Sequence, residues 1–297
     1  MSRRTVRSVT PSRSASAGPD LFWALRGGSG NFGVVTGMEI ALFPVNRIYG
    51  GCLFFDLAET PGVLDSWLQW TDSVDEAMTS AVAVVPFPDV AGVPQEMRGK
   101  HVAQLQISYC GPTERGRELL APLRAIRGVL RDTVRELPYA DSGSVFDEPA
   151  EPHGYRGNTA LLDQLDSGDL ARLVGQVGPA SCSPHVVSVR HLGGALARKP
   201  DTPNAVGHRG AAYALGLLAA VDPAAANQTH LPRRGLLAPF SDHILGPSLN
   251  FSFGPIEEHD IRAAFEQADY RRLARLRAEY DPHNLLRPNH PIPDVSD

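Results

Sequence analysis

A run of glycines near the start of the chain constrains its structure most. Four glycines lie within seven residues, between a predicted helix at 21–26 and a predicted strand at 34–43: Gly27, Gly28, Gly30 and Gly33. Glycine adopts positive φ without steric cost, so the run predicts a tight turn from helix to strand. Four glycines exceed what one turn needs, and exposed N–H groups in such a loop suit an anionic ligand. Both interpretations, a turn and a ligand-binding loop, stay open at this point.

Residues 28–33 satisfy the spacing G-x-G-x-x-G of dinucleotide-binding loops, but their surroundings argue against that fold. In a Rossmann fold the loop follows a strand and opens a helix, whose N-terminus meets the pyrophosphate. Here a predicted helix precedes the loop and a predicted strand follows it. The sequence also lacks G-K-[ST], which argues against a P-loop.

Composition narrows the class of protein further. The chain has 297 residues, of which 42% are hydrophobic and 21% charged, as in an ordinary globular protein. Its net charge of -5 offers no basic surface for nucleic acid, and no apolar run is long enough to span a membrane. No apolar stretch of an export signal follows the N-terminal arginines, and the three cysteines are widely spaced. We therefore expect a cytoplasmic protein with no nucleic-acid or membrane partner.

Hydrophobic periodicity predicts an α+β fold, in which helices cover one face of a large antiparallel sheet. Residues 138–160 are rich in turn-forming types, which favours a loop. Helices are expected at 21–26, after Thr60, after Thr113, at 167–177 and at 257–280. Strands are expected at 34–43, 48–57, 81–85, 101–109, 185–192 and 209–221.

Two segments near the ends of the chain resemble known motifs. Residues 19–36, PDLFWALRGGSGNFGVVT, strongly resemble a signature of the FAD-linked oxidases of the vanillyl-alcohol oxidase superfamily, nearest to its berberine bridge enzyme-like branch. Residues 280–287, YDPHNLLR, resemble the closing motif Y-D-P-x-N-x-F-R of that family. Weaker matches lie between them in the expected order, at 191–195, 208–209 and 250–251. The order and spread of these matches make chance resemblance unlikely to explain them.

The resemblance implies a bipartite FAD-binding domain that is interrupted by a substrate domain. It assigns residues 1–45 to the trailing part of the FAD-binding domain, 46–247 to the substrate domain, and 248–297 to a C-terminal segment that returns to the FAD domain. The implied chemistry is hydride transfer from a substrate C–H to the flavin, followed by reoxidation by O₂. The residues that it places along the cofactor are Gly27, Gly28, Gly30, Asn31, Gly33, Val34, Thr36, Asn250 and Asn284.

Three residues are candidates for catalysis: Tyr213, His208 and Ser248. Ser248 stands where the family often has tyrosine, and an aliphatic hydroxyl is a much worse base than a phenol with a pKa of about 10. Tyr213 is the only acid/base residue of its predicted strand, and both it and His208 have a purely structural alternative. No group of His, Asp or Glu has metal-ligand spacing, so no metal is expected.

The start of the sequence departs from the family pattern. Only nineteen residues precede Asp20, whereas family members carry a long FAD subdomain there, with a pyrophosphate loop and a histidine that attaches FAD covalently. We expect this first subdomain and the covalent-linkage residues to be absent. FAD would then be bound non-covalently or lost.

Two functions remain open. The first is a truncated FAD-dependent oxidoreductase that oxidises an alcohol, an amine or a natural-product C–H of a small-molecule substrate. The second is a non-catalytic remnant that binds a small molecule or a protein. Loss of the first subdomain would uncover the apolar residues of 34–43, so we expect self-association or a separately encoded N-terminal half.

Overall fold

The computed structural model describes residues 18–146, 154–181, 184–221 and 233–293. Nine strands form one antiparallel sheet in the order β4-β1-β3-β2-β7-β8-β6-β9, with β5 also pairing with β1. The strands are β1 (Arg47–Asp56), β2 (Met78–Pro86), β3 (His101–Tyr109), β4 (Val129–Asp132), β5 (Arg135–Pro138), β6 (Tyr155–Leu162), β7 (Val186–His191), β8 (Tyr213–Ala220) and β9 (Ile244–Pro247). The predicted α+β class with a large antiparallel sheet is confirmed.

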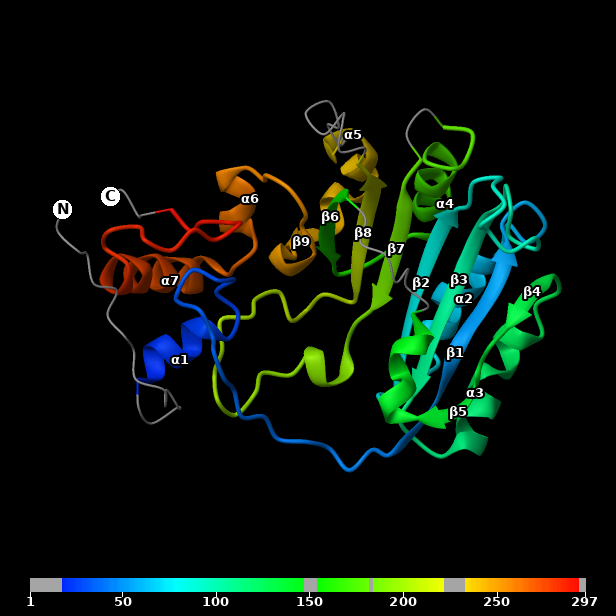
Figure 1. Cartoon of the computed structure of the whole chain (residues 1–297), viewed down its shortest axis with the longest axis horizontal. Coiled ribbons are helices and arrows are strands. Elements are labelled where there is room, and N and C mark those ends of the chain that lie inside the picture. The colour runs from blue at the N-terminus through cyan, green and yellow to red at the C-terminus, as the bar shows by residue number, and fades with distance from the viewer. Residues whose placement is uncertain (1–17, 147–153, 182–183, 222–232, 294–297) are drawn as a thin grey trace.

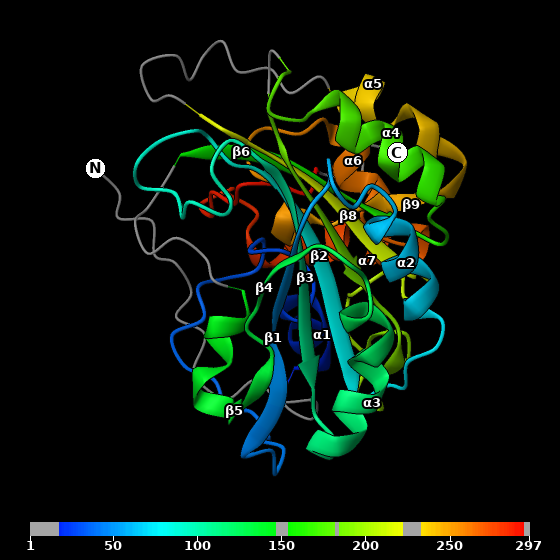
Figure 2. The same cartoon turned by 90° about the vertical axis from the view of Figure 1, so that its right-hand side faces the viewer.

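Helices cover one face of this sheet. Figure 2 shows α2 (Val63–Thr71), α3 (Thr113–Arg124) and α4 (Ser167–Gln176) on the same side of the strands. The largest hydrophobic cluster lies between these helices and the sheet and includes the fully buried Trp67 of α2 and Leu105 of β3. Alternate residues of each strand therefore point into this core, and the others point to the opposite face.

A second hydrophobic cluster joins the two ends of the described chain. It packs Trp23 of α1 (Pro19–Leu25) and Phe32 against Ile261 of α6 (Glu258–Ala263) and Leu273 of α7 (Gln267–Tyr280). Figure 1 shows α1 beside α7, at one end of the molecule. We call residues 18–33 and 249–293 together the end module. The domain boundaries at 45/46 and 247/248 stay predictions.

Most predicted elements are present with small shifts at their ends. The predicted strand 101–109 coincides with β3, and the predicted helix 257–280 is divided into α6 and α7. Four strands, β4, β5, β6 and β9, were not predicted, and β6 lies partly in the segment that its turn-forming residues assigned to a loop. The remaining short helices of the described residues are α5 (Arg233–Leu237) and the 3₁₀ helices η1 (Tyr139–Val145), η2 (Gly194–Leu196), η4 (Ala238–His243) and η5 (Leu249–Phe251).

The predicted strand at 34–43 is wrong. Residues 33–46 are extended but belong to no strand, and they cross from the end module to β1 along one side of the molecule (Figure 1). Within the described part of the chain, the only backbone hydrogen bond within 33–45 runs from the amide of Val45 to the carbonyl of Phe43, at 2.8 Å. An alternating apolar sequence forms a strand only beside another strand, and here no described strand lies next to it.

Candidate functional site

The closing motif forms a turn that its own side chains hold. Pro282 ends α7, and the buried carboxylate of Asp281 accepts hydrogen bonds from the amides of Leu285 at 2.7 Å and Leu286 at 2.9 Å. Asn284 has a φ of 50°, in the left-handed region that asparagine tolerates better than most residues. The motif is therefore explained locally by capping and turn geometry.

Arg277 connects α7 to the last described segment. Its guanidinium donates to the side-chain oxygen of Asn284 at 2.8 Å and to the carbonyl of Ile292. Arg277 is buried, and no acidic partner for it is found in the described residues, so its charge is stabilised by neutral oxygens alone. Asn284 thus has its side-chain oxygen occupied by a structural contact.

Asn31 joins the glycine loop to the same segment. Its amide donates to the carbonyls of Gly28 at 3.0 Å, Ser29 at 3.2 Å and His290 at 3.1 Å. Its side-chain oxygen accepts from the amide of Ile292 at 2.9 Å. The side chain is 1% exposed and fully engaged, so it holds the loop in place and is not free to donate to a cofactor.

The four glycines divide into two kinds. A Cβ at Gly27 would lie 2.5 Å from the backbone of Ala205, and one at Gly28 would lie 2.4 Å from the ring of Phe32. These two glycines are explained by close packing inside the protein. Gly30 and Gly33 have φ values of +78° and +153°, and a Cβ at Gly33 would meet no atom within 4 Å.

Gly33 therefore faces open space, and the backbone that follows it is exposed. Val34 is 82% and Val35 is 54% exposed, and Thr36 is exposed as well. Of the cofactor candidates in the glycine loop, only Gly30, Gly33, Val34 and Thr36 offer accessible backbone.

The segment after β9 links the end module to the sheet. The Ser248 amide donates to the Thr159 carbonyl, and the Thr159 hydroxyl donates to the Phe251 carbonyl, both at 3.0 Å. A ring nitrogen of His290 lies 3.0 Å from the Ser252 carbonyl. Ser248 and Asn250 are consequently held near β6, and Asn250 is exposed.

His208 lies between β9 and α6. It has a φ of 52°, and its two ring nitrogens lie 2.7 Å from the carbonyl of Ala263 and 3.5 Å from the carboxylate of Glu266. Its ring also fills the space beside Gly246, where a Cβ would lie 2.6 Å from it. These contacts fit a structural histidine.

Tyr213 points into the helix-covered core. It is 9% exposed, and its hydroxyl lies 2.8 Å from the Thr71 hydroxyl, beneath α2. Its ring packs edge-on against Trp67, with ring centroids 6.3 Å apart, and beside His191. Burial raises the pKa of the Tyr213 phenol, which makes it a weaker acid. This geometry gives no support to a role for Tyr213 as a catalytic base.

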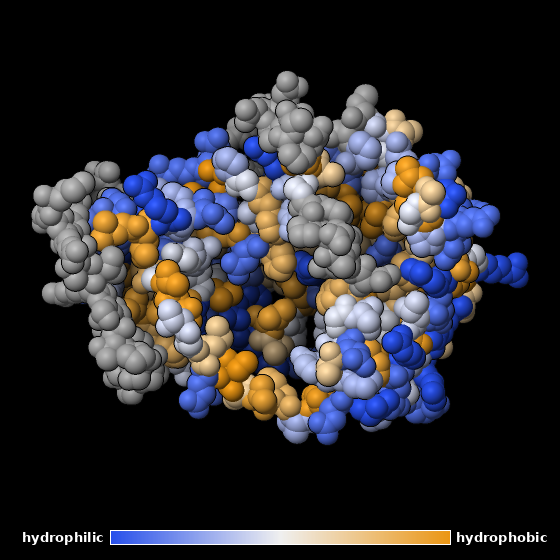
Figure 3. Space-filling model, in the orientation of Figure 1, coloured by the Kyte–Doolittle hydropathy of each residue, from blue (hydrophilic) through white to orange (hydrophobic). Residues whose placement is uncertain are grey.

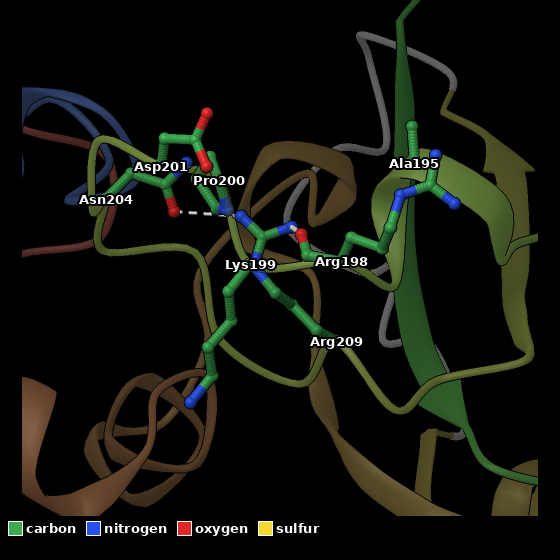
Figure 4. Close-up of a pocket in the computed structure, with 7 residues that line it drawn as sticks. All are labelled: Ala195, Arg198, Lys199, Pro200, Asp201, Asn204 and Arg209. Atoms are coloured by element: carbon green, nitrogen blue, oxygen red, sulfur yellow. Dashed lines mark hydrogen bonds between the residues drawn. The ribbon is translucent and has the colours of Figure 1, made fainter.

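The loop between β7 and β8 forms a basic pocket, shown in Figure 4. Its volume is about 480 Å³, and it is lined by Ala195, Arg198, Lys199, Pro200, Asp201, Asn204 and Arg209. Arg209 donates to the carbonyls of Leu196 and Arg198 and to the side chain of Asn204, while Arg198 pairs with Glu76. The two arginines thus shape the loop that packs against Gly27.

Several residues of this region were not singled out from the sequence. Arg277, Asp281 and His290 hold the end module together, and Arg190 on β7 stacks on Phe251 with its guanidinium carbon 4.3 Å from the ring centroid. Asp281 belongs to the recognised closing motif, so the motif itself was the signal. Among the arginines of α7, Arg271 and Arg275 are exposed, whereas Arg277 is buried.

Within residues 18–146, 154–181, 184–221 and 233–293, no group of three or more His, Cys, Asp or Glu side chains is arranged to hold a metal ion. None of the helices in these ranges has both the length and the apolar character that crossing a membrane requires.

Comparisons with known proteins agree with this fold. The chain is 24% identical over 289 residues to "Uncharacterized FAD-linked oxidoreductase YgaK" of Bacillus subtilis, covering 95% of this chain and 61% of the relative. Its structure matches that of 6-hydroxy-D-nicotine oxidase from Arthrobacter nicotinovorans with a TM-score of 0.74 at 20% identity, over 95% of this chain and 62% of the oxidase. Berberine bridge enzyme matches with a TM-score of 0.72 at 16% identity, over 95% and 62% of the two chains. No protein-family model matches the chain.

The chain is therefore a homologue of FAD-linked oxidoreductases. It shares its fold with 6-hydroxy-D-nicotine oxidase, and berberine bridge enzyme is another of its structural neighbours. The chain spans about three fifths of the length of these relatives, 61% and 62% in the two cases above.

The residues present fit a flavin in part. Gly30 and Gly33 leave room for a cofactor to approach closely, since a Cβ at Gly30 would meet only Pro288, at 4.0 Å, and one at Gly33 would meet no atom within 4 Å. Residues 34–36, which follow them, are exposed. The exposed amide of Asn250 has no hydrogen bond within the described residues, so it too is free to contact a ligand. Asn31 and Asn284 hold the loops around that space by hydrogen bonds within the protein.

Proposed function

We propose that this chain supplies the substrate-binding sheet and one wall of the flavin site of an FAD-dependent oxidoreductase. Its substrate would be an alcohol, an amine or a natural product, oxidised at a C–H bond. When bound, the flavin supplies the hydride acceptor. The observation that carries the proposal is the open space at Gly33, where an exposed segment begins. The side chain of Asn31, two residues earlier, ties the glycine loop to Ile292 by hydrogen bonds.

In this proposal the residues of the chain position the reactants. The backbone of 30–36 approaches the cofactor, and Asn250 donates a hydrogen bond to its edge. Arg277 and Asn284 hold the closing turn, and Asn31 holds the glycine loop. Ser248 lies beside Asn250 and is the polar side chain available at that position, in place of a tyrosine. The FAD would be bound without a covalent bond to the described residues.

FAD binding by the full chain tests this proposal. FAD fluorescence is titrated with the wild type and with the Gly33→Ala variant. A Cβ at Gly33 occupies the space that the cofactor needs and also disfavours φ of +153°, so we expect binding to weaken about tenfold or more. Gly37→Ala is the matched control, because Gly37 lies in the same segment, also has open space around it and has no positive φ.

Equal FAD affinity in the Gly33→Ala variant and the wild type would contradict the proposal, as would no FAD binding by either.

A second candidate function is a non-catalytic binding module. The buried hydroxyl of Tyr213 favours this second function. Tyr213 points into the helix-covered core, whereas a catalytic base would act on the uncovered face of the sheet. Retained binding of a small molecule without any flavin binding would support this second candidate.

We propose further that another polypeptide covers residues 33–46. Within the described residues, the backbone of this segment is hydrogen-bonded only between Val45 and Phe43 and between Tyr139 and Asn46. A mostly unpaired backbone with exposed apolar side chains is typical of a strand that lacks its neighbour. The most exposed of these side chains are Val34, Met38, Ile40, Leu42 and Phe43, between 67% and 85% exposed. A strand added beside this segment would pair its backbone and bury these side chains.

Sedimentation of the full chain tests the covering of this segment. When no other polypeptide is present, a second copy is the available partner, so we expect association that increases with concentration. Met38→Lys combined with Leu42→Lys places charge on the apolar side and should leave a monomer. Leu196→Lys is the control, because Leu196 is 62% exposed but lies outside the segment. A wild type that stays monomeric at all concentrations would contradict this proposal.

A further inference from the structure

Arg190 lies on the face of the sheet that the helices leave uncovered. Strand pairing places Arg190 directly between Ala81 of β2 and Ala214 of β8. Its neighbours in sequence, Val187 and Val189, belong to the helix-side core, so Arg190 points to the opposite face. Figure 3 views the molecule from this uncovered side and shows it hollowed near its centre.

Small and neutral polar residues surround this arginine. The row that contains Arg190 continues through Ala81 to Gln106 of β3. The adjacent row on the same face contains no charged side chain between β3 and β6: it consists of Gln104, Ala83, Ser188, Gly216 and Thr159. Neither row offers a carboxylate to pair with Arg190.

Phe251 provides an apolar wall beside the guanidinium. The Arg190 guanidinium carbon lies 4.3 Å from the centre of the Phe251 ring, which is 41% exposed. The hydrogen bond from the Thr159 hydroxyl to the Phe251 carbonyl holds the backbone of Phe251 beside the sheet. A guanidinium that stacks by its face on an aromatic ring keeps its N–H edges available for a planar acceptor.

Other stacked arginines of the protein differ from Arg190. Arg124 stacks on Tyr49 and pairs with Asp132, and Arg272 stacks on Trp23 and pairs with Asp20. Arg262 stacks on Tyr270 and pairs with Glu258. Across the described residues, Arg190 has neither an ion pair nor a hydrogen bond to its guanidinium. Arg26, which stacks on Phe22, has no acidic partner among the described residues either, but it donates to the carbonyls of Thr202 and Pro203. Within the described residues, the charge of the stacked Arg190 is therefore uncompensated.

We propose that Arg190 binds the carboxylate of an acidic substrate with an apolar or aromatic body. The guanidinium donates two parallel hydrogen bonds to the carboxylate, Phe251 packs against the body of the molecule, and Ala81 and Ala214 leave room above the sheet. This inference deepens the proposed function, because Phe251 is adjacent to Asn250, which that proposal assigns to the flavin edge. Gln104, Gln106 and Ser188 supply neutral polar contacts on the same face.

Direct binding of two matched probes to the full chain tests this assignment. Benzoate and its neutral analogue benzamide are titrated by calorimetry without added FAD. We expect benzoate to bind about tenfold or more tightly than benzamide, as a charge-assisted bidentate contact predicts. Arg190→Gln should abolish the preference, and Arg190→Lys should keep part of it, because lysine keeps the charge without the planar fork.

Arg131→Gln is the matched control. The Arg131 guanidinium carbon lies 4.2 Å from the centre of the Phe54 ring, and Arg131 belongs to β4, at one end of the strand order. This variant should keep the preference for benzoate. Absence of benzoate binding, equal affinity for the two probes, or an unchanged preference in Arg190→Gln would overturn the inference. Because no flavin is present, these outcomes are independent of the FAD titration that tests the proposed function.

Discussion

The sheet and the end module are stabilised in different ways. Between the sheet and its helices the core is mainly apolar and centres on side chains such as Trp67 and Leu105, with a few buried polar groups such as Thr71. The end module has a smaller apolar cluster, and hydrogen bonds of buried polar or charged residues connect or cap its segments. The five buried residues of this kind are Asn31, Ser252, Arg277, Asp281 and His290. Apolar packing tolerates small displacements, whereas buried hydrogen bonds fix positions, so the difference assigns positioning to the end module.

Removal of Trp67 should cause the largest loss of stability. Trp67 is fully buried on the face of α2 that packs on the sheet. Trp67→Ala leaves a cavity there and is expected to lower the free energy of unfolding by about 3–5 kcal/mol. Denaturant unfolding measures this loss. Trp67→Phe is the control: it leaves a smaller cavity and also removes an indole N–H that has no partner within the described ranges, so it should cost clearly less. Equal losses in the two variants would mean that the core repacks freely.

Asn31 provides the corresponding test in the end module. Asn31→Ala leaves the Ile292 amide and the His290 carbonyl without these buried partners, which is expected to cost about 2–4 kcal/mol. Hydrogen exchange should localise the change to residues 277–293. Asn31→Asp should be at least as damaging, because it places a carboxylate oxygen against three carbonyls. The exposed Asn289→Ala is the control, and a comparable loss there would refute the assignment.

The sequence predicted the sheet better than the site. Strands such as β3 follow from alternation alone, because one face of the sheet is buried and the other is not. The segment 34–43 has the same alternation but no neighbouring strand, and periodicity carries no information about neighbours. The two motifs at 19–36 and 280–287 lie largely in segments that pack together in the end module. Roles within it depend on which hydrogen bonds are already used, as at Asn31, and that requires coordinates.

Tyr213 tests whether its hydroxyl acts in packing or in catalysis. The Thr71 hydroxyl donates its proton to the Leu68 carbonyl at 2.6 Å, so Tyr213 must donate to Thr71. Tyr213→Phe removes one buried hydrogen bond and leaves Thr71 its other partner, so it should cost about 1 kcal/mol. The denaturant midpoint measures this cost, with Tyr139→Phe as an exposed control. A larger effect on FAD binding than on stability would restore Tyr213 to the candidate site.

His191 gives the smallest expected effect, and it appears only in the pH dependence of stability. Burial lowers the pKa of His191, and the nearby Asp72 opposes this only in part. The unfolded chain, with a histidine pKa of about 6.5, therefore takes up a proton before the folded chain does as the pH falls. Stability contributed by the neutral ring is present above about pH 6.5 and is lost as the pH falls from there toward the lower, folded-state pKa.

Urea midpoints measured between about pH 7.5 and 5.5 should therefore fall for the wild type and fall less for His191→Gln. Burial lowers the pKa of His101 in the same way. The urea midpoint of His191→Gln should therefore still fall with pH, and it should fall less again when His101→Gln is added. Equal slopes in the wild type and the double variant would show that neither ring is held neutral by the fold. Such a result would also weaken the contrast between the two regions, because both histidines lie at the apolar sheet and neither belongs to the polar network of the end module.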